Sequence, residues 1–369
     1  MDITLFSPDI GHIELQQKII TAWQQNRLPH AFLFYGPEGC GKDAFAIALA
    51  QFINTATPDG IPDTADPQYL KIAHLQHPDV NFIFPTPASK NVKDEEIADV
   101  LAGIARNPFR RSHFPGKNTF IGIDTIRELK NEARFKLYEG RKKIFIISQA
   151  DHMRVEAANA LLKLLEEPPD NLMLILTTSN IHQILPTIKS RCQLMTFHRY
   201  SRDEMEAILR KHTPEIPPEE LSIIIPLSGY NLKRAFEFLE KDVLSIREQA
   251  IEFLRKVVLI RRSQELFAII ESLTAKKDRE DARLLLWFLL LWFQDILYIK
   301  TNTVSEDALY NTDKIDALTK FYQYLPDLDI AAVVWEIETA LQNLNDIRNF
   351  NPLLIFTTLA IKLHQQLKR

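Results

Sequence analysis

Cysteine is scarce in this sequence, with only Cys40 and Cys192 among 369 residues. Two cysteines so far apart in the chain exclude a disulfide framework and leave too few thiolates for a four-cysteine zinc site. They suit a protein that works in a reducing cytoplasm. We therefore expect a cytoplasmic location and no bound zinc.

Long apolar runs and an excess of one charge are missing as well. The longest apolar run, Leu284–Phe293, has ten residues, about half of what a membrane-spanning helix needs. The first seventeen residues carry three acids and no long apolar core, unlike a secretory signal. The formal net charge of −4 provides no chain-wide basic field for nucleic acid. We expect no membrane contact, and contact with DNA only through a local patch or through partners.

Strand and helix patterns alternate in the first half of the chain. Short apolar runs predict strands at Ala31–Tyr35, Lys143–Ser148 and Leu172–Thr178. Helical periodicity lies between and around these runs, at Phe45–Phe52, Asp94–Ile104, Ile123–Tyr138 and Ala157–Glu167. This alternation predicts a parallel, doubly wound α/β sheet.

The second half of the chain reads as helical, apart from a short apolar run at Ile223–Ile225. Long amphipathic patterns cover Ser245–Arg261, Ala282–Lys300, Ile330–Arg348 and Pro352–Lys368. We predict three domains: an α/β domain over 1–199, a small helical domain over 200–243 and a helical C-terminal domain over 244–369.

A phosphate-binding loop is indicated between the first strand and the helix that follows it. Residues 36–43 read GPEGCGKD and match the pattern G-x-x-x-x-G-K-[ST] at every position except the last. The glycines Gly36, Gly39 and Gly41 let backbone N–H groups face a phosphate, and Lys42 adds positive charge. Asp43 stands where a hydroxyl normally holds Mg²⁺, and its carboxylate either ligates a cation or repels a nucleotide. Binding of ATP or ADP without hydrolysis stays open, as does a tight turn that holds no ligand.

The acidic pair that usually completes such a site is missing. It is expected at the end of the second strand, where it holds Mg²⁺ and activates water. This chain has Ser148 and Gln149 there, and Asp151 lies three residues beyond Ser148. We expect no hydrolysis of ATP by this chain.

Five segments together resemble the bacterial DNA polymerase III clamp-loader subunits of the AAA+ family. They are LPHAFLFYGPEGCGK (28–42), HPDV (77–80), ANALLKLLEEPP (158–169), LTTSN (176–180) and LPTIKSRC (185–192). The resemblance is sharp from about Asp9 to Tyr200 and looser beyond. It implies an AAA+ domain with a phosphate-loop-type parallel sheet, a small helical lid domain and an all-helical C-terminal collar domain that oligomerises.

Within this family the sequence resembles the delta-prime branch. The ATP-hydrolysing gamma/tau branch is expected to carry Ser or Thr after the loop lysine and an Asp-Glu pair after the second strand. The alternatives are an active gamma/tau-type ATPase and, from another class, a phosphate-loop small-molecule kinase. The resemblance implies gamma/tau and delta subunits as partners, with the sliding clamp and primed DNA reached through the complex. Many relatives carry a four-cysteine zinc module before HPDV, but residues 54–76 contain no cysteine here.

Three further site residues follow from the resemblance. Arg191 matches the arginine finger, whose planar charged fork acts in trans on ATP held by the next subunit. Thr178 matches sensor 1 and Arg234 matches sensor 2. The simpler alternatives are a surface arginine for Arg191, a turn cap for Thr178 and a helix-surface ion pair for Arg234.

Two clusters have no assigned role. The stretch from Arg106 to Lys117 includes Arg110, Arg111 and His113 and no acid, so it either contacts DNA phosphates or forms a solvated loop. The aromatic residues between Trp287 and Phe293 form either the core of the C-terminal domain or a subunit contact.

Overall fold

The computed structural model describes residues 6–7, 10–88, 92–110, 114, 117–259, 263–274, 279–301, 309–346, 348 and 350–368. The chain divides into two compact units. The first consists of Met1–Glu215 with Tyr230–Phe236, and the second of Ile216–Gly229 with Glu237–Arg369. The predicted domain boundaries at 199/200 and 243/244 stay a prediction.

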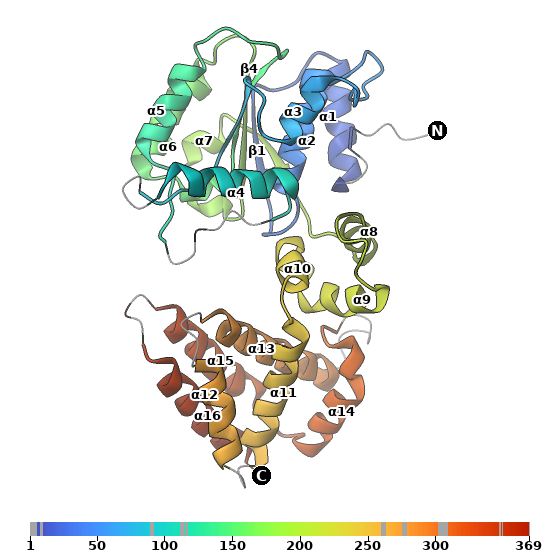
Figure 1. The fold of residues 1–369 in the computed structure, drawn as a ribbon, viewed down its shortest axis with the longest axis vertical. Helices are drawn as coiled ribbons and strands as arrows, with labels where there is room; N and C mark the ends of the chain where they lie inside the picture. The colour runs from blue at the N-terminus through green and yellow to red at the C-terminus, as the bar shows by residue number, and fades with distance from the viewer. Residues whose placement is uncertain are drawn as a thin grey trace. The chain divides into compact units, whose positions relative to one another are not determined.

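The first unit is built on a five-stranded parallel sheet in the order β2-β3-β4-β1-β5 (Figure 1). The strands are β1 Ala31–Tyr35, β2 Val80–Ile83, β3 Lys143–Ile147, β4 Leu172–Thr178 and β5 Gln193–Thr196. The three predicted strands are therefore confirmed, and they are the three inner ones. Their residues are nearly all buried because helices cover both faces of the sheet. Sequence patterns missed the edge strands β2 and β5, whose side chains are largely exposed or half-buried.

Helices cover the sheet on both sides. Figure 1 shows α5 and α6 on one side and α1, α2 and α3 on the other. The helices of this unit are α1 Ile13–Gln24, α2 Lys42–Thr55, α3 Pro67–Ala73, α4 Asp94–Arg106, α5 Ile123–Glu132, α6 Val155–Glu166, α7 Pro186–Lys189 and α8 Arg202–His212. On α6, Ala158, Leu161 and Leu165 are buried in the core, and Leu162 packs against this core partly buried.

The predicted helix over Ile123–Tyr138 is wrong at its C-terminal end, because α5 stops at Glu132. After Ala133, the N–H groups of Arg134 and Phe135 donate only three residues back, to Asn131 and Glu132. Those of Tyr138, Glu139 and Gly140 donate instead to the carboxylate of Asp79. No local pattern in the sequence reveals a partner that lies 59 residues away.

The second unit is helical. Its helices are α9 Pro218–Leu227, α11 Val243–Leu259, α12 Ser263–Thr274, α13 Glu280–Thr301, α14 Ile315–Tyr324, α15 Ile330–Asn345 and α16 Pro352–Leu367; α10, Leu232–Leu239, begins in the first unit and ends in the second. The run Ile223–Ile225 lies in a helix, α9. A parallel α/β domain followed by a helical region is the predicted fold class, which is confirmed.

Helix α13 is the centre of the second unit and contacts α11, α14 and α15. Its Phe288, Trp292 and Phe293 are buried, and Trp287 donates from Nε1 to the carbonyl of Leu227 at 3.3 Å. The core interpretation of this aromatic cluster is therefore confirmed. With 22 residues, α13 is long and apolar enough to cross a membrane by length and composition, but 56% of its apolar window is buried, as in a core helix.

Candidate functional site

The glycine loop between β1 and α2 approaches other parts of the chain very closely. Gly39 and Gly41 both have a φ of 75°, which L-residues with side chains rarely adopt. A Cβ at Gly39 would lie 1.9 Å from Oδ1 of Asn231, and one at Gly41 would lie 2.0 Å from the hydroxyl of Tyr200. Both positions require glycine in this structure for conformation and for space.

Residues from the start of α10 close over the glycine loop. The N–H of Leu232 donates to the carbonyl of Gly39 at 3.1 Å. The cavity that remains beside Gly39 and Lys42, lined also by Lys233, has a volume of about 20 Å³. Sites for small molecules usually have about 300–1,000 Å³. This cavity is much smaller than a nucleotide, and binding of ATP or ADP stays a prediction.

Lys42 is held by the loop itself. The side chain is buried, and its Nζ donates to the carbonyls of Gly36 at 2.9 Å and Pro37 at 2.6 Å. A third contact, at 3.2 Å, joins Nζ to the hydroxyl of Ser179 just after β4. The three protons of the ammonium group thus have protein acceptors. Sequence reasoning missed Ser179, which directly follows the predicted sensor residue.

Asp43 meets the ends of the two neighbouring strands. Its Oδ2 accepts a hydrogen bond from the hydroxyl of Ser148 at 2.9 Å, and its Oδ1 accepts one from Thr177 at 2.7 Å. Ser148 and Thr177 are both buried. In a complete nucleotide site the helix provides the hydroxyl and the strand provides the carboxylate. Here the two kinds of side chain have exchanged places.

This arrangement does not fit a magnesium ion. Mg²⁺ prefers six oxygen ligands in near-octahedral geometry, usually one or two carboxylates with waters and substrate phosphates. Both oxygens of the only carboxylate in the cluster already accept hydrogen bonds from Ser148 and Thr177. Gln149, in the second acid position, contributes a backbone N–H to Thr177 at 3.3 Å. The cluster is a hydrogen-bonded joint between α2, β3 and β4.

Thr178 is engaged in a local turn. Its hydroxyl donates to Asp151 at 2.8 Å and accepts from the N–H of Asn180 at 3.0 Å. The side chain is buried at the end of β4. These contacts are those of a turn cap, the simpler of the two interpretations, and a sensor role for Thr178 stays a prediction.

Arg191 lies in the turn between α7 and β5, and its guanidinium is held by two neighbours. Nη2 lies 2.8 Å from Oε1 of Glu166, the last residue of α6. Nη1 donates to the carbonyl of Thr187 at 2.9 Å. The side chain keeps 35% of its exposure. The predicted finger is thus a surface arginine in an ion pair, and its action on a neighbouring subunit stays a prediction.

Arg234 lies on the first turn of α10, close to the glycine loop in the chain's fold. Its N–H donates to Oδ1 of Asn231 at 3.1 Å, which caps this helix. The residues that line the small cavity beside the loop include its neighbour Lys233 and not Arg234. The sensor 2 assignment stays a prediction, and Lys233 joins the candidate site.

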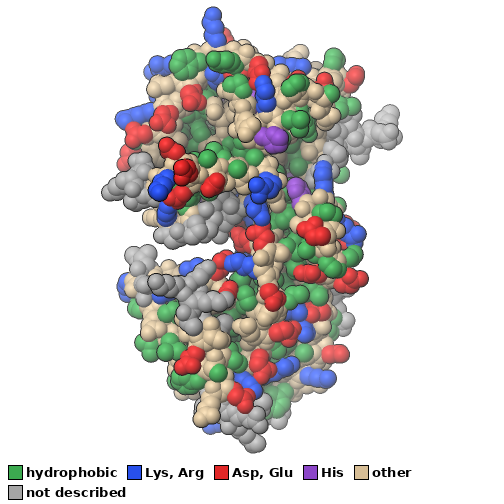
Figure 2. All heavy atoms as spheres, in the orientation of Figure 1, with side chains coloured by type: hydrophobic (Ala, Val, Ile, Leu, Met, Phe, Trp, Pro, Cys, Tyr) green, Lys and Arg blue, Asp and Glu red, His purple; other side chains and the backbone are tan. Residues whose placement is uncertain are grey.

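The basic stretch from Arg106 to Lys117 is described only in part, because Arg111 and His113 lie outside the described residues. Lys117 pairs with Glu96 at 2.5 Å, and the first turn of α4 carries two more acids. Figure 2 shows acidic and basic side chains interspersed over this face of the first unit. These contacts favour a charge-balanced surface, and direct DNA contact stays a prediction.

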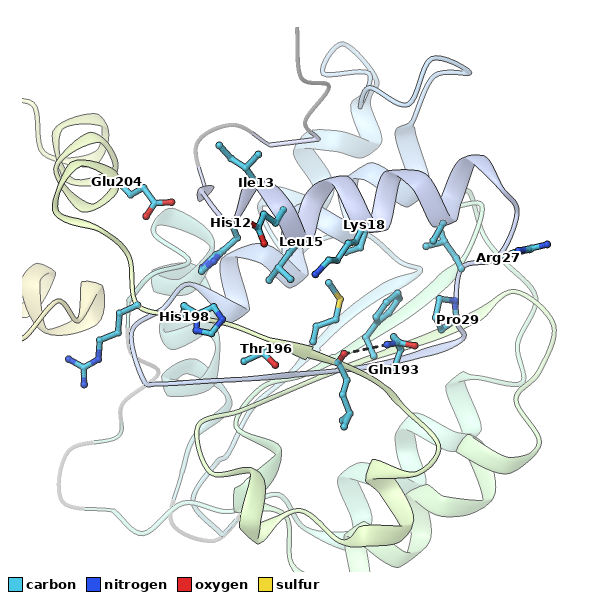
Figure 3. Close-up of a pocket in the computed structure, with 18 residues that line it drawn as sticks. His12, Ile13, Leu15, Lys18, Arg27, Pro29, Gln193, Thr196, His198 and Glu204 are labelled. Carbon is cyan, nitrogen blue, oxygen red and sulfur yellow. Dashed lines mark hydrogen bonds between the residues drawn. The ribbon is translucent and has the colours of Figure 1, made fainter. Parts of the chain in front are cut away.

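A larger cavity, of about 880 Å³, lies between α1 and the edge strand β5, and its lining includes none of the predicted site residues. Figure 3 shows Lys18 of α1 pointing into it and Arg27 pointing away. His12 lies at its edge, and its Nε2 is 2.8 Å from the carbonyl of Cys40 in the glycine loop. Burial lowers the pKa of His12, so the neutral ring donates this hydrogen bond. His12 therefore links this cavity to the glycine loop.

Residues 54–76, where the resemblance implies a zinc module in many relatives, form ordinary packing in this chain. They comprise the end of α2, a turn and α3, which packs against α2. Within the described residues no group of three His, Cys, Asp or Glu side chains is placed to hold a metal. Burial raises the pKa of the Cys192 thiol to about 12, so the free side chain is protonated at neutral pH. The absence of zinc stays a prediction.

A family model described as DNA polymerase III, delta subunit, matches residues 11–201, just over half of the chain. The chain belongs to this family of clamp-loader subunits. The delta' subunit of Bacillus subtilis is 26% identical over 310 residues, which cover 83% of both proteins. The gamma/tau subunit of Mycobacterium tuberculosis is 28% identical over 252 residues, which cover 67% of this chain.

The coverage of the DNA polymerase III relatives differs between the two kinds of subunit. This chain spans only 37% of the length of the Mycobacterium tuberculosis gamma/tau subunit and 55% of the tau subunit of Bacillus subtilis. A gamma subunit-related protein of DNA polymerase III from Thermotoga maritima has a similar solved structure. It is 19% identical, with a TM-score of 0.48, and covers 95% of this chain and 99% of its own. The match of the family model over residues 11–201 confirms the resemblance found in the five motifs at the level of the family.

Proposed function

We propose that this chain is the delta-prime-type subunit of a DNA polymerase III clamp loader. It hydrolyses no ATP and supplies Arg191 in trans to the ATP site of a neighbouring subunit. The observation that carries the proposal is the joint formed by Asp43, Ser148 and Thr177. At the position where a complete site binds the metal ion, this chain has hydrogen bonds between its own side chains.

Two physical effects oppose hydrolysis at this joint. The carboxylate of Asp43 adds negative charge where a β- or γ-phosphate needs a cation, and like charges repel strongly in a partly buried site. The neutral Ser148 and Gln149 also offer no carboxylate to orient an attacking water. ATP or ADP is accordingly a possible ligand of the glycine loop and Lys42, and not a substrate.

Arg191 suits an action on another subunit. Its guanidinium is partly exposed and paired with Glu166 at the surface, and such pairs contribute only about 0–1 kcal/mol. A triphosphate presented by a neighbour is a stronger partner for a planar fork than one exposed carboxylate. Moving the guanidinium from Glu166 to that phosphate therefore costs little.

The partners follow from the family. We propose gamma/tau and delta subunits as direct partners, and the sliding clamp and primed DNA as partners of the complex, in the cytoplasm. Coverage supports the delta-prime type, because the delta' relative matches this chain over 83% of both lengths whereas the gamma/tau relatives are much longer.

The test is ATP turnover by the purified chain, with and without primed DNA. We expect a rate no higher than background, and co-purification with gamma/tau and delta subunits. The alternative is an active gamma/tau-type ATPase, because the chain is also 28% identical to a gamma/tau subunit. Turnover that persists through further purification and disappears in Lys42→Ala would decide for that alternative.

A further inference from the structure

Strand β5 is an uncovered edge of the sheet. It is the last strand in the order β2-β3-β4-β1-β5 and pairs with β1 alone among the described strands. Three of its four residues, Gln193, Leu194 and Thr196, are exposed, whereas the other edge strand, β2, has no exposed residue. Edge strands are commonly protected by charged residues, proline or a covering element. The sequence of β5, QLMT, contains neither a charge nor a proline.

The backbone of β5 has hydrogen-bonding groups that point away from the sheet. The N–H of Phe197, just after β5, donates to the carbonyl of Tyr35 in β1 at 2.8 Å. Because successive backbone groups of a strand point to opposite sides, the N–H and C=O groups of Leu194 and Thr196 face away from β1. Within the described part of the chain, the carbonyl of Leu194 accepts from the side-chain amide of Gln193 at 3.4 Å (Figure 3). This distance exceeds the usual value of about 2.9–3.0 Å, so an incoming donor displaces the amide easily.

The cavity of about 880 Å³ lies along this free edge, and we call it the α1–β5 groove. All four residues of β5 line it, and α1 forms the opposite wall. Exposed apolar side chains lie on both walls, since Ile13 of α1 is 45% exposed and Leu194 is 42% exposed. Figure 3 shows Leu15 pointing from α1 into the same space. An exposed sheet edge beside side-chain pockets is the arrangement in which extended peptides bind by strand addition.

One cation points into the α1–β5 groove. Lys18 extends into it from α1 (Figure 3), and within the described residues its ammonium group forms no hydrogen bond or ion pair. Two acids also line the groove, Glu14 and Glu204. Glu204 accepts hydrogen bonds from Ser201 in the capping box of α8, and Glu14 does not pair with Lys18. The positive charge inside the groove is therefore available to a carboxylate of a ligand.

We infer that the α1–β5 groove binds an extended, acidic peptide segment of another protein, which pairs with the outward edge of β5 as an additional strand. Side chains alternate along a strand, so every second residue of the segment points into the groove. Apolar residues of the segment contact Ile13, Leu15 and Leu194, and one Asp or Glu contacts Lys18. Backbone hydrogen bonds supply affinity in this mode, and the alternate side chains supply specificity.

Other ligands match the α1–β5 groove less well. Single-stranded nucleic acid needs several cations and aromatic side chains for stacking. Here Arg27 points away from the groove (Figure 3), and Phe32, the one phenylalanine of the lining, is buried. A small molecule would leave the free edge of β5 unpaired. A peptide strand satisfies both the edge and Lys18.

The experiment selects random eight-residue peptides, displayed on phage, against the full chain. We expect the enriched sequences to have apolar residues at alternate positions, with one Asp or Glu in the same alternating set. Synthetic, fluorescently labelled versions of these peptides are then titrated with the chain, and anisotropy gives the dissociation constant. Selection that enriches no peptide beyond its level with the Lys18→Glu chain would overturn the inference.

Strand addition is tested on the peptide itself, so that no variant of the chain has to fold. Each residue of a selected peptide is N-methylated in turn, which removes one N–H donor. We expect affinity to fall roughly three- to tenfold at every second position, because only alternate N–H groups of a strand face its neighbour. Losses at every position, or at none, would contradict pairing with β5.

The role of Lys18 is tested by exchanging charges. Lys18→Glu should weaken binding about tenfold, and a peptide whose acid is replaced by lysine should bind this variant better than the original peptide does. The matched control is Lys163→Glu, which changes an exposed lysine of α6, a helix on the other side of the sheet (Figure 1). It should leave peptide affinity unchanged. Equal affinity of the original peptide for Lys18→Glu and the unmodified chain would overturn the inference.

A second copy of this chain is the other protein that could cover β5. Sedimentation of the full chain at rising concentration tests for it. A monomer supports the inference, and a dimer that the selected peptide dissociates would assign the edge to a second copy instead. Neither ATP turnover nor assembly with other subunits enters these measurements, so their result is independent of the test of the proposed function.

Discussion

Arg191 and Glu166 form an ion pair of 2.8 Å that joins the two most specific motifs of the chain. Arg191 belongs to LPTIKSRC, and Glu166 belongs to ANALLKLLEEPP at the end of α6. The motif that carries the proposed finger thus meets its acidic partner inside the same subunit. Release of the guanidinium from Glu166 becomes part of any action on a neighbour.

Glu166→Gln tests this relationship. The amide keeps the shape and removes the charge, so the change in folding free energy should stay within about 0.5 kcal/mol, as for exposed ion pairs. We expect the ATPase rate of the reconstituted complex to be unchanged or raised by less than about fivefold, because the competing partner of Arg191 is weakened. A loss as large as that in Arg191→Ala would mean that Glu166 holds the finger in its working position.

Asp43→Ala tests the joint in the glycine-loop site. It leaves the buried hydroxyls of Ser148 and Thr177 without their acceptor, so the free energy of unfolding should fall by roughly 1–3 kcal/mol. The measurement is urea denaturation of the variant and of Ser148→Ala and the double variant. The two single changes should not add, because the side chains share one hydrogen bond of 2.9 Å. Additive effects would show that the carboxylate and the hydroxyl are not coupled.

Asp79→Asn tests the support of the connection between α5 and β3, residues 133–142, through its pH dependence. Burial raises the pKa of Asp79, but the N–H groups of Gly140, Glu139 and Tyr138, with Lys143, outweigh it and hold the pKa below its ordinary value. A lowered folded-state pKa gives stability that is present above the unfolded pKa of about 3.9 and is lost as pH falls through the folded value. The variant should lose roughly 1–3 kcal/mol at pH 7.

The difference between Asp79→Asn and the unmodified chain should then shrink below about pH 4. Urea denaturation at pH 7, 5, 4 and 3 measures it. A difference that stays constant over this range would show that the charge of Asp79 does not stabilise the connection.

The inner part of the fold could be predicted from the sequence, and its edges could not. Strands β1, β3 and β4 are continuous apolar runs because both of their faces are buried. The edge strand β5 exposes most of its residues and gives no such run. The segment that follows α5 is held by Asp79, whose contact with Tyr138 spans 59 residues of sequence.

The candidate site, too, could be predicted from the sequence only in part. Local motifs indicated the glycine loop, Asp43 and the missing acids, because these are properties of residue type at fixed spacing. The hydrogen bonds from Ser148 and Thr177 to Asp43 span 105 and 134 residues. The hydrogen bond from Leu232 to Gly39 spans more residues still, and the ion pair of Arg191 with Glu166 joins two separate motifs. Such contacts depend on the folded chain and leave no periodicity in the sequence.

Arg191→Ala in the reconstituted clamp loader tests the central claim most directly. The subunit should fold, with a stability change within about 0.5 kcal/mol, and join the complex. An arginine finger is worth roughly 10³–10⁵ in rate at its own site, so DNA-stimulated ATPase and clamp loading should fall, although less overall if other sites remain active. Arg191→Lys should rescue only in part, because an ammonium group cannot reproduce the guanidinium fork.

The matched control is Arg210→Ala, which removes a comparable surface arginine that pairs with Glu206 on α8. It should load clamps at the unmodified rate. The account predicts a loss of DNA-stimulated ATPase for Arg191→Ala and none for Arg210→Ala, in complexes of equal composition. Assembly of the Arg191→Ala subunit with unmodified ATPase and clamp loading would contradict the account and leave the chain a passive structural subunit.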